Sequence, residues 1–171
     1  LESSKGYADT HGVQVELLVS APVWVQVDRD RLMQVLVNLL SNAIKFSPRD
    51  SRVYVAVTDR EGMVRVSVQD HGPGIPLEFQ TRIFQKFAQA DGSDTRASGG
   101  TGLGLSICKA LVERMSGQIG FESTPGQGTL FYFDLPIVPS VTPAPETVAD
   151  LAVASVLVCE DDADIAYLLK R

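Results

Sequence analysis

The stretch RVYVAVTDREGMVRVSVQ, residues 52–69, decides the fold. Apolar and polar residues alternate through 52–58 and again through 63–69, which is the period of a strand with one buried face. Between the two runs stands the polar sequence Asp59-Arg60-Glu61-Gly62, which favours a turn. The stretch therefore predicts a β-hairpin.

Periodicity and helix end signals extend this prediction outward in both directions. Asp28 is a good N-cap, Pro48 ends the helix that follows it, and Gly117 is placed as the stop of a later helix. The expected strands are 13–19, 23–27, 118–124 and 129–135, and the expected helices are 31–46, 77–83 and 102–116. This order predicts an α+β two-layer sandwich, with helices on one face of a mixed sheet.

Composition argues against two kinds of partner. Apolar residues make up 44% and charged residues 21% of the 171 residues, an ordinary globular balance. A net charge of −6 and a pI near 4.8 argue against nucleic acid, whose partners usually carry a basic face. No apolar run reaches the roughly 18–20 residues that cross a bilayer. We expect no nucleic-acid partner and no membrane contact by this fragment.

The start of the chain and its cysteines indicate its setting. The chain begins at Leu1 without a Met, so we expect an excised piece of a longer protein. It has no signal-peptide pattern, and we expect it to be cytoplasmic, although its parent could be membrane-anchored. Cys108 and Cys159 lie in apolar stretches without metal-ligand spacing. They could pair in principle, but we expect them to be buried and reduced.

Beyond Pro136 the composition changes. Residues 137–154 are rich in proline and alanine and are typical of an interdomain linker. VLVC (156–159) then has the pattern of a buried strand, followed by an acidic run at 160–162 and the beginning of a helix at 163–171.

Glycines gather in three short segments. Eight of the 14 are Gly72 and Gly74; Gly99, Gly100, Gly102 and Gly104; and Gly126 and Gly128. The middle group stands just ahead of a predicted helix, where free backbone amides and the helix dipole favour phosphate. A loop without ligand is the alternative for this group, and tight turns are the alternative for the pairs. Walker A, dinucleotide-fold and protein-kinase motifs are all absent from the sequence.

A polar stripe follows the predicted helix 31–46. At about 100° per residue, Asn38, Asn42 and Lys45 lie within roughly 40° of one line, which Arg31 and Gln34 share. Asparagine is a poor helix former, and this stripe lacks the Glu/Lys mixture of a solvated face, which is the alternative interpretation. Amide oxygens beside a lysine suit hydrated Mg²⁺ that carries phosphates.

Asp70 follows an alternating strand and precedes two glycines, Gly72 and Gly74. A carboxylate entering a pocket there could accept a hydrogen bond from an exocyclic amine. The alternative is that Asp70 caps the next turn. We interpret His71 as a turn residue without a catalytic role, and His11 as part of a turn before the first strand.

Five ordered motifs together carry a family resemblance. They are NLLSNAIKF (38–46), DHGPGI (70–75), IFQKFAQ (83–89), GGTGLGLSI (99–107) and GQGT (126–129). They resemble the N, G1, F, G2 and G3 boxes of sensor histidine-kinase catalytic domains, which belong to the GHKL superfamily. The resemblance covers about residues 10–136 and implies a Bergerat-type fold, a mixed, mostly antiparallel sheet with helices on one face.

The resemblance implies a role for each matching residue. Asn42 would hold Mg²⁺, with Asn38 and Lys45 near the phosphates of ATP, and Asp70 would bind the adenine amino group. Phe84 and Phe87 would anchor the loop at about 89–101 as a lid over ATP. The implied nucleotide-binding set is Asn38, Asn42, Lys45, Asp70, Gly72, Gly74, Ile75, Phe87, Gly100, Thr101, Gly102, Leu103, Gly104 and Thr129. The implied catalytic set is Asn38, Lys45 and Arg96, with Arg96 near the γ-phosphate.

The tail VLVCEDDADIAYLL resembles the start of a response-regulator receiver domain, in which Glu160 and Asp161 match the acidic pair that binds Mg²⁺. An acidic helix start is the alternative. We expect four parts, namely the end of a connection from a dimerisation domain (1–9), the ATP-binding domain (10–136), a linker (137–154) and a truncated receiver (155–171). We expect strand 156–159 to pair with the edge of the kinase sheet or with another molecule.

The expected function is that of the ATP-binding half of a hybrid histidine kinase. It would pass the γ-phosphate of Mg-ATP to a histidine on the dimerisation domain of the same protein, with the receiver as a further partner. Neither His11 nor His71 matches the acceptor motif. One alternative is an ATPase of the same superfamily, which Asn38 disfavours because an amide cannot accept a proton. The other is a non-catalytic nucleotide-binding module.

Overall fold

The computed structural model describes residues 2–19, 24–89, 101–137 and 157–159. A five-stranded sheet with strand order β1-β3-β4-β6-β5 forms one layer. Its strands are β1 (Gln14–Val19), β3 (Arg52–Arg60), β4 (Met63–Gln69), β5 (Gln118–Thr124) and β6 (Gly128–Pro136). Strand β1 pairs with β3 in parallel, and the other pairs are antiparallel. The sheet is therefore mixed and mostly antiparallel, as predicted.

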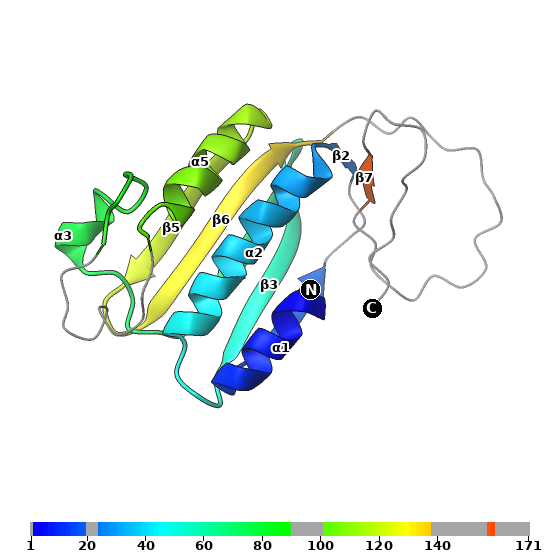
Figure 1. Ribbon diagram of the computed structural model, residues 1–171. Helices are drawn as coiled ribbons and strands as arrows, with labels where there is room; N and C mark the ends of the chain where they lie inside the picture. The colour runs from blue at the N-terminus through cyan, green and yellow to red at the C-terminus, as the bar shows by residue number, and fades with distance from the viewer. Residues whose placement is uncertain (1, 20–23, 90–100, 138–156, 160–171) are drawn as a thin grey trace, which may run out of the picture.

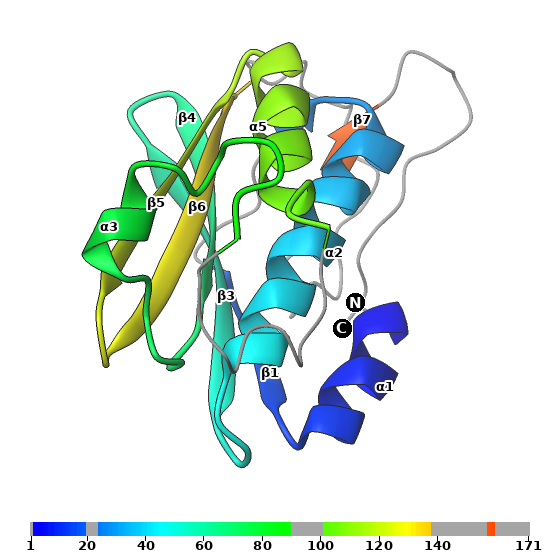
Figure 2. The same ribbon diagram turned by 60° about the vertical axis from the view of Figure 1, so that its left-hand side comes forward.

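Helices form the second layer, on one face of the sheet (Figures 1 and 2). They are α1 (Glu2–His11), α2 (Arg29–Phe46) and α5 (Gly104–Arg114), while the short α3 (Leu77–Gln80) lies beyond the β5 edge of the sheet. Helix α2 begins as expected, because the Asp28 carboxylate accepts a hydrogen bond of 3.0 Å from the Arg31 amide. The predicted α+β two-layer sandwich is confirmed.

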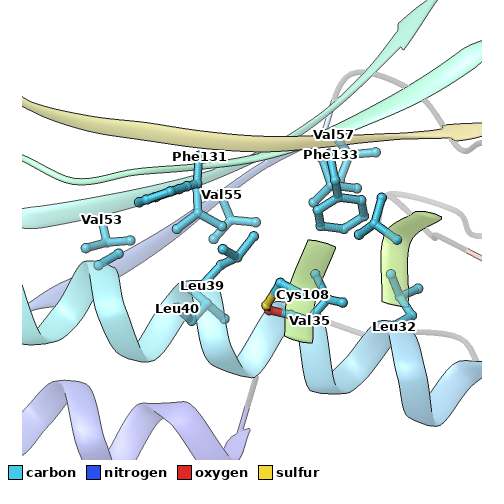
Figure 3. Close-up of a cluster of buried hydrophobic side chains, with 14 of the residues drawn as sticks. Leu32, Val35, Leu39, Leu40, Val53, Val55, Val57, Cys108, Phe131 and Phe133 are labelled. Atoms are coloured by element: carbon cyan, nitrogen blue, oxygen red, sulfur yellow. The ribbon is translucent and has the colours of Figure 1, made fainter. Parts of the chain in front are cut away.

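The core lies between the two layers (Figure 3). Val35 and Leu39 of α2 and Phe133 of β6 each have 0% of their surface exposed. Alternate residues of β3 and β4 are buried, which is the pattern that residues 52–69 predict. Cys108 of α5 is a free, buried thiol, and burial raises its pKa to about 12. It therefore stays a protonated core residue at neutral pH.

Helix α1 was not predicted, and the expected turn at His11 is wrong, because His11 is the last residue of this helix. The sequence ESSKGYADTH contains few strong helix formers and has Gly6 in its middle. Ala8, which is 3% exposed, belongs to the core, and α1 packs against α2. Tertiary contact therefore decides this helix.

The residue that terminates α5 lies one position earlier than predicted. Ser116, and not Gly117, has the left-handed backbone conformation, with φ of 59°. The Gly117 amide donates to the Val112 carbonyl at 2.9 Å and the Ser116 amide to the Glu113 carbonyl at 3.1 Å, which is a Schellman motif. The helices predicted at 77–83 and 102–116 are both shorter in the structure, and turns follow α3.

Two short strands lie apart from the main sheet. Strand β2 (Trp24–Gln26) pairs in parallel with β7 (Leu157–Cys159), at the end of the sandwich where α2 begins (Figure 1). Both strands were predicted. The expected pairing of the later strand with the edge of the main sheet is wrong, because its partner is β2 in a separate two-stranded sheet. The rest of the predicted linker and receiver start lies outside the described residues.

Among the helices that the structure describes, none is long and apolar enough to span a membrane.

Candidate functional site

Asp70 and Thr129 lie side by side at one end of the sheet. The strand register pairs Gln69 with Leu130, and the ladder continues as the Asp70 amide donates to the Thr129 carbonyl at 2.9 Å. Each residue is 5% exposed, and they are the only buried polar residues in the described part of the chain. Because Val68 and Phe131, two residues away, are core residues, alternation directs both side chains toward the helical layer.

The Asp70 carboxylate is held by two backbone amides. Its Oδ1 accepts from the Gly72 amide at 2.8 Å and from the Thr129 amide at 3.2 Å. Burial raises the pKa of Asp70, while these two hydrogen bonds and the charge of His71 lower it. The first contact caps the following turn, which was the alternative interpretation. Within the described residues, Oδ2 accepts no hydrogen bond and remains available to a donor.

The loop after Asp70 packs against its neighbours through backbone atoms. A Cβ at Gly72 would lie 2.5 Å from the Phe46 carbonyl oxygen, so this loop lies directly on the end of α2. Gly74, with φ of 69°, lies against the Thr124 backbone. Ile75 is buried, and its amide is 2.9 Å from Ser123 Oγ. His71 is exposed outside any helix or strand, with Nδ1 3.1 Å from the Arg52 carbonyl oxygen.

The predicted polar stripe is present on α2. Asn38 and Asn42 are half-buried, and Asn42 Nδ2 donates to Asn38 Oδ1 at 3.4 Å. This contact leaves Asn42 Oδ1 as an oxygen that can face a cation. Lys45 is half-buried nearly one turn further on, with Nζ 5.0 Å from the centre of the Phe46 ring. The three predicted side chains therefore share one side of the helix.

The first turn of α5 meets this stripe. A Cβ at Gly104 would lie 2.6 Å from Asn38 Oδ1, so the first turn of α5 lies directly against the Asn38 side chain. The N-cap, Leu103, makes no side-chain capping bond, and the first amides of a helix have no partner within it. Thr101 is exposed, while Gly102 and Leu103 are half-buried. The predicted phosphate-binding amides and the asparagines thus lie together.

The two phenylalanines before the predicted lid behave differently. Phe84 is half-buried and packs edge-on against Phe121, with ring centres 5.9 Å apart. The ring of Phe87 is 72% exposed, so Phe87 is not a core aromatic, and its role in anchoring the lid stays a prediction. Its backbone amide instead donates to the Gly102 carbonyl at 2.9 Å. Arg96, Gly99 and Gly100 lie outside the described residues, as does most of the loop at 89–101.

Ser123 and Gln80 were missed by the sequence analysis. Gln80 Nε2 donates to the Ile75 carbonyl at 2.9 Å and to the Ser123 carbonyl at 3.3 Å. Ser123 shares the face of β5 that carries Ile119 and Phe121, both packed against the core. The sequence did offer a signal for Ser123, because a hydroxyl at a core-facing position of an alternating strand needs a hydrogen-bond partner.

A cleft lies between the start of α2 and the end of α5. It has a volume of about 290 Å³ and is lined by residues such as Val27, Arg31, Leu111 and Arg114. Arg31 and Asn42 are roughly 16 Å apart along the helix at 1.5 Å per residue. None of the predicted site residues lines this cleft, so the candidate site is elsewhere.

The residues present fit the magnesium ion that the resemblance implies. Mg²⁺ binds to one or two protein oxygens and otherwise to waters and substrate phosphates. Asn42 offers one such oxygen, beside the amides at the start of α5. Among the described residues, no group of three or more histidine, cysteine or acidic side chains could hold a metal by itself.

Comparison with known proteins gives a consistent result. The family model described as "Histidine kinase-, DNA gyrase B-, and HSP90-like ATPase" matches residues 27–139. The sensor protein GacS of Pseudomonas syringae pv. syringae is 44% identical over 133 residues, 73% of this chain and 15% of that protein. The chain spans only 14–15% of the length of such curated relatives.

Solved structures agree. The structure titled "Crystal structure of ShkA full-length in complex with AMPPNP" has a TM-score of 0.71 and 33% identity, covering 82% of this chain and 29% of that one. The mycobacterial sensor histidine kinase MprB has a TM-score of 0.70 and 28% identity, covering 81% of this chain and 90% of that one. The chain therefore belongs to the histidine kinase-, DNA gyrase B- and HSP90-like ATPase family, as the ATP-binding domain of a sensor histidine kinase.

Proposed function

We propose that this domain binds Mg-ATP and donates its γ-phosphate to a histidine on a separate dimerisation domain of the same protein. One observation carries the proposal, namely that α2 contacts both groups of predicted residues: the loop that holds Asp70 lies on its end through Gly72 and Phe46, and Asn38 on the same helix contacts Gly104 at the start of α5. The first suits a base and the second suits phosphates. The AMPPNP complex of the similar ShkA supports the same ligand class.

In this proposal the site acts by positioning and by charge neutralisation. Asp70 Oδ2 accepts a hydrogen bond from the adenine amino group, while Gly72 and Gly74 let the base approach the backbone. The amides from Gly102 to Gly104 and the Lys45 ammonium hold the phosphates. Magnesium, held through Asn42, would neutralise phosphate charge when bound. Asn38, Lys45 and Arg96 are the proposed catalytic residues.

The proposal includes a hybrid architecture, in which residues 155–171 begin a receiver domain after the linker 137–154. Two features support it. The strand β7 occurs where the receiver resemblance expects its first strand, and the acidic Glu160 and Asp161 follow it in the sequence. The receiver and the dimerisation domain are then partners of this domain within one protein.

A hydrolytic ATPase is the second candidate. Water activation needs a basic group at the position of Asn38, whose amide is not one. Asp70 is the one buried carboxylate among the described residues, and its Oδ1 is held by two backbone amides. The kinase interpretation is therefore favoured over rapid hydrolysis.

A radiolabelled-ATP assay with three samples tests the function. The samples are this chain, the helical-hairpin dimerisation domain of its parent, and their mixture. The chain alone should bind ATP, hydrolyse it slowly and leave itself unlabelled, whereas the mixture should label the hairpin histidine weakly because the two halves are no longer tethered. Rapid phosphate release by the chain alone would favour the ATPase, and ATP binding without transfer in the mixture would favour a non-catalytic module.

Asn42→Ala should abolish most of the gain in ATP affinity that magnesium gives, because the variant lacks the proposed oxygen ligand. Titration calorimetry with and without Mg²⁺ measures this gain. Gln34→Ala is the matched control, since it removes an exposed amide about 12 Å toward the start of the same helix. If Asn42→Ala keeps the full magnesium effect, the metal assignment is wrong.

A further inference from the structure

The cleft between α2 and α5 combines buried apolar residues with two exposed arginines. Val27 and Leu111 are each 7% exposed, whereas Arg31 and Arg114 are both exposed to solvent. Besides the arginines, Asp28 is the one charged residue that lines the cleft, so the lining has a net formal charge of +1 in a chain of −6. The cleft is therefore a positive spot on an acidic chain.

Arg114 is the arginine whose charge is not offset. Arg31 Nε lies 3.5 Å from Asp28 Oδ2, so the charge of Arg31 is partly compensated. In the part of the chain that the structure describes, the Arg114 guanidinium makes no ion pair or hydrogen bond. A guanidinium offers several N–H donors to a carboxylate. Arg114 can therefore bind an acidic side chain that reaches the cleft.

Strand β7 ends beside this cleft. It runs parallel to β2, with Cys159 opposite Gln26, a residue that lines the cleft. Neighbouring strands lie about 4.8 Å apart, and Figures 1 and 2 show β7 beside the start of α2. The sequence continues from Cys159 with Glu160, Asp161 and Asp162. Because three extended residues span roughly 10 Å, three consecutive carboxylates are within reach of the cleft.

We infer that the cleft is a docking site for the acidic segment 160–162 of the same chain, whose carboxylates bind to Arg114 and Arg31. Charge complementarity and the parallel register of β2 and β7 carry the inference, which is independent of the nucleotide site. A single exposed ion pair is weak, because water and salt screen it. The pairing of β2 with β7 tethers the segment beside the arginines, so a few weak ion pairs suffice.

Zero-length cross-linking of the full chain with a carbodiimide tests the contact. The carbodiimide activates a carboxylate, and a lysine amine in contact with it attacks to form an amide and release a urea. Arginine does not react, so Arg114→Lys supplies the amine and keeps the charge. Arg82→Lys is the control, because it is the same change on an exposed arginine beyond α3. Mass spectrometry should find an amide between the introduced lysine and residues 160–162 in Arg114→Lys alone.

Charge reversal tests the contribution of the ion pairs. Arg114→Glu should raise the rate of amide hydrogen exchange in β7 roughly 2- to 10-fold, because exposed attractions become repulsions. High salt should reduce this difference. Adding Glu160→Lys and Asp161→Lys to Arg114→Glu should restore slow exchange, since the facing charges are opposite again. Arg82→Glu is the control and should leave exchange in β7 unchanged.

Two results would overturn the inference outright. One is equal cross-linking of 160–162 in the two lysine variants, and the other is equal exchange in β7 for Arg114→Glu and Arg82→Glu. Cross-links found only between molecules, when isotope-labelled and unlabelled chains are mixed, would overturn it in favour of a second copy as the occupant. If exchange in Arg114→Glu rises throughout 104–114, α5 itself has loosened, and the cross-linking of the charge-preserving Arg114→Lys then decides.

Discussion

Asp70→Asn should weaken ATP binding by roughly 10- to 100-fold, the effect expected for losing a hydrogen bond to a charged group. Asparagine keeps an oxygen that can accept from the Gly72 and Thr129 amides, as Asp70 Oδ1 does now. In place of Oδ2, asparagine has an NH₂ group. This group and the adenine amine are both hydrogen-bond donors, so they cannot bond to each other. ADP should lose as much affinity as ATP, because both share the base. Titration calorimetry with both nucleotides measures the effect.

The same substitution should leave the empty domain at least as stable as the wild type. Burial raises the pKa of Asp70, so the ionised carboxylate costs the folded state free energy at neutral pH. That cost appears as pH rises through the folded pKa and is absent at lower pH, where the carboxyl is protonated. Any stability advantage of Asp70→Asn in thermal unfolding should therefore shrink as the pH is lowered.

Asp59→Asn is the matched control for charge. Asp59 is exposed at the far end of the same β-hairpin, so its substitution changes the net charge equally without touching the site. It should leave nucleotide affinity unchanged. Wild-type ATP affinity in Asp70→Asn would contradict the assignment of Asp70 to the base.

Gly128→Ala should lower the free energy of unfolding by roughly 2–5 kcal/mol, which combines an unfavourable backbone conformation with overpacking. Gly128 has φ of 104°, and a Cβ there would run into the backbone carbonyl of Asp70. The variant should also lose ATP affinity, since the clash displaces the carboxylate. Urea unfolding followed by circular dichroism measures the stability.

Gly126→Ala in the same turn separates the cost of the backbone conformation from the cost of overpacking. Gly126 has φ of 83°, but no atom lies within 4 Å of an added Cβ. Gly126→Ala should therefore lower the free energy of unfolding by only about 1 kcal/mol, which is the cost of the backbone conformation alone. If both alanine variants lose the same stability, the close approach of Gly128 to Asp70 contributes nothing.

Much of the fold follows from local sequence patterns. The alternation of 52–69 predicts the central hairpin, and Asp28 predicts the start of α2. The stripe of Asn38, Asn42 and Lys45 follows from helical periodicity, and the structure places the three on one side of α2. The order of five motifs then predicts the family. These features are local because a period or a cap depends on residues within a few positions of one another.

The sequence alone therefore determined every strand, the helices other than α1, the layer arrangement and the identity of most candidate site residues. Only the tertiary structure decided which residues meet: the Asp70–Thr129 pairing, the contact of Gly104 with Asn38, and the bond from the Ile75 amide to Ser123. It also decided that α1 is a helix, through Ala8, and that β2 pairs with β7. The reason is physical. Strand register and close backbone approach join residues far apart in the chain, and their energies depend on packing that local propensity does not contain.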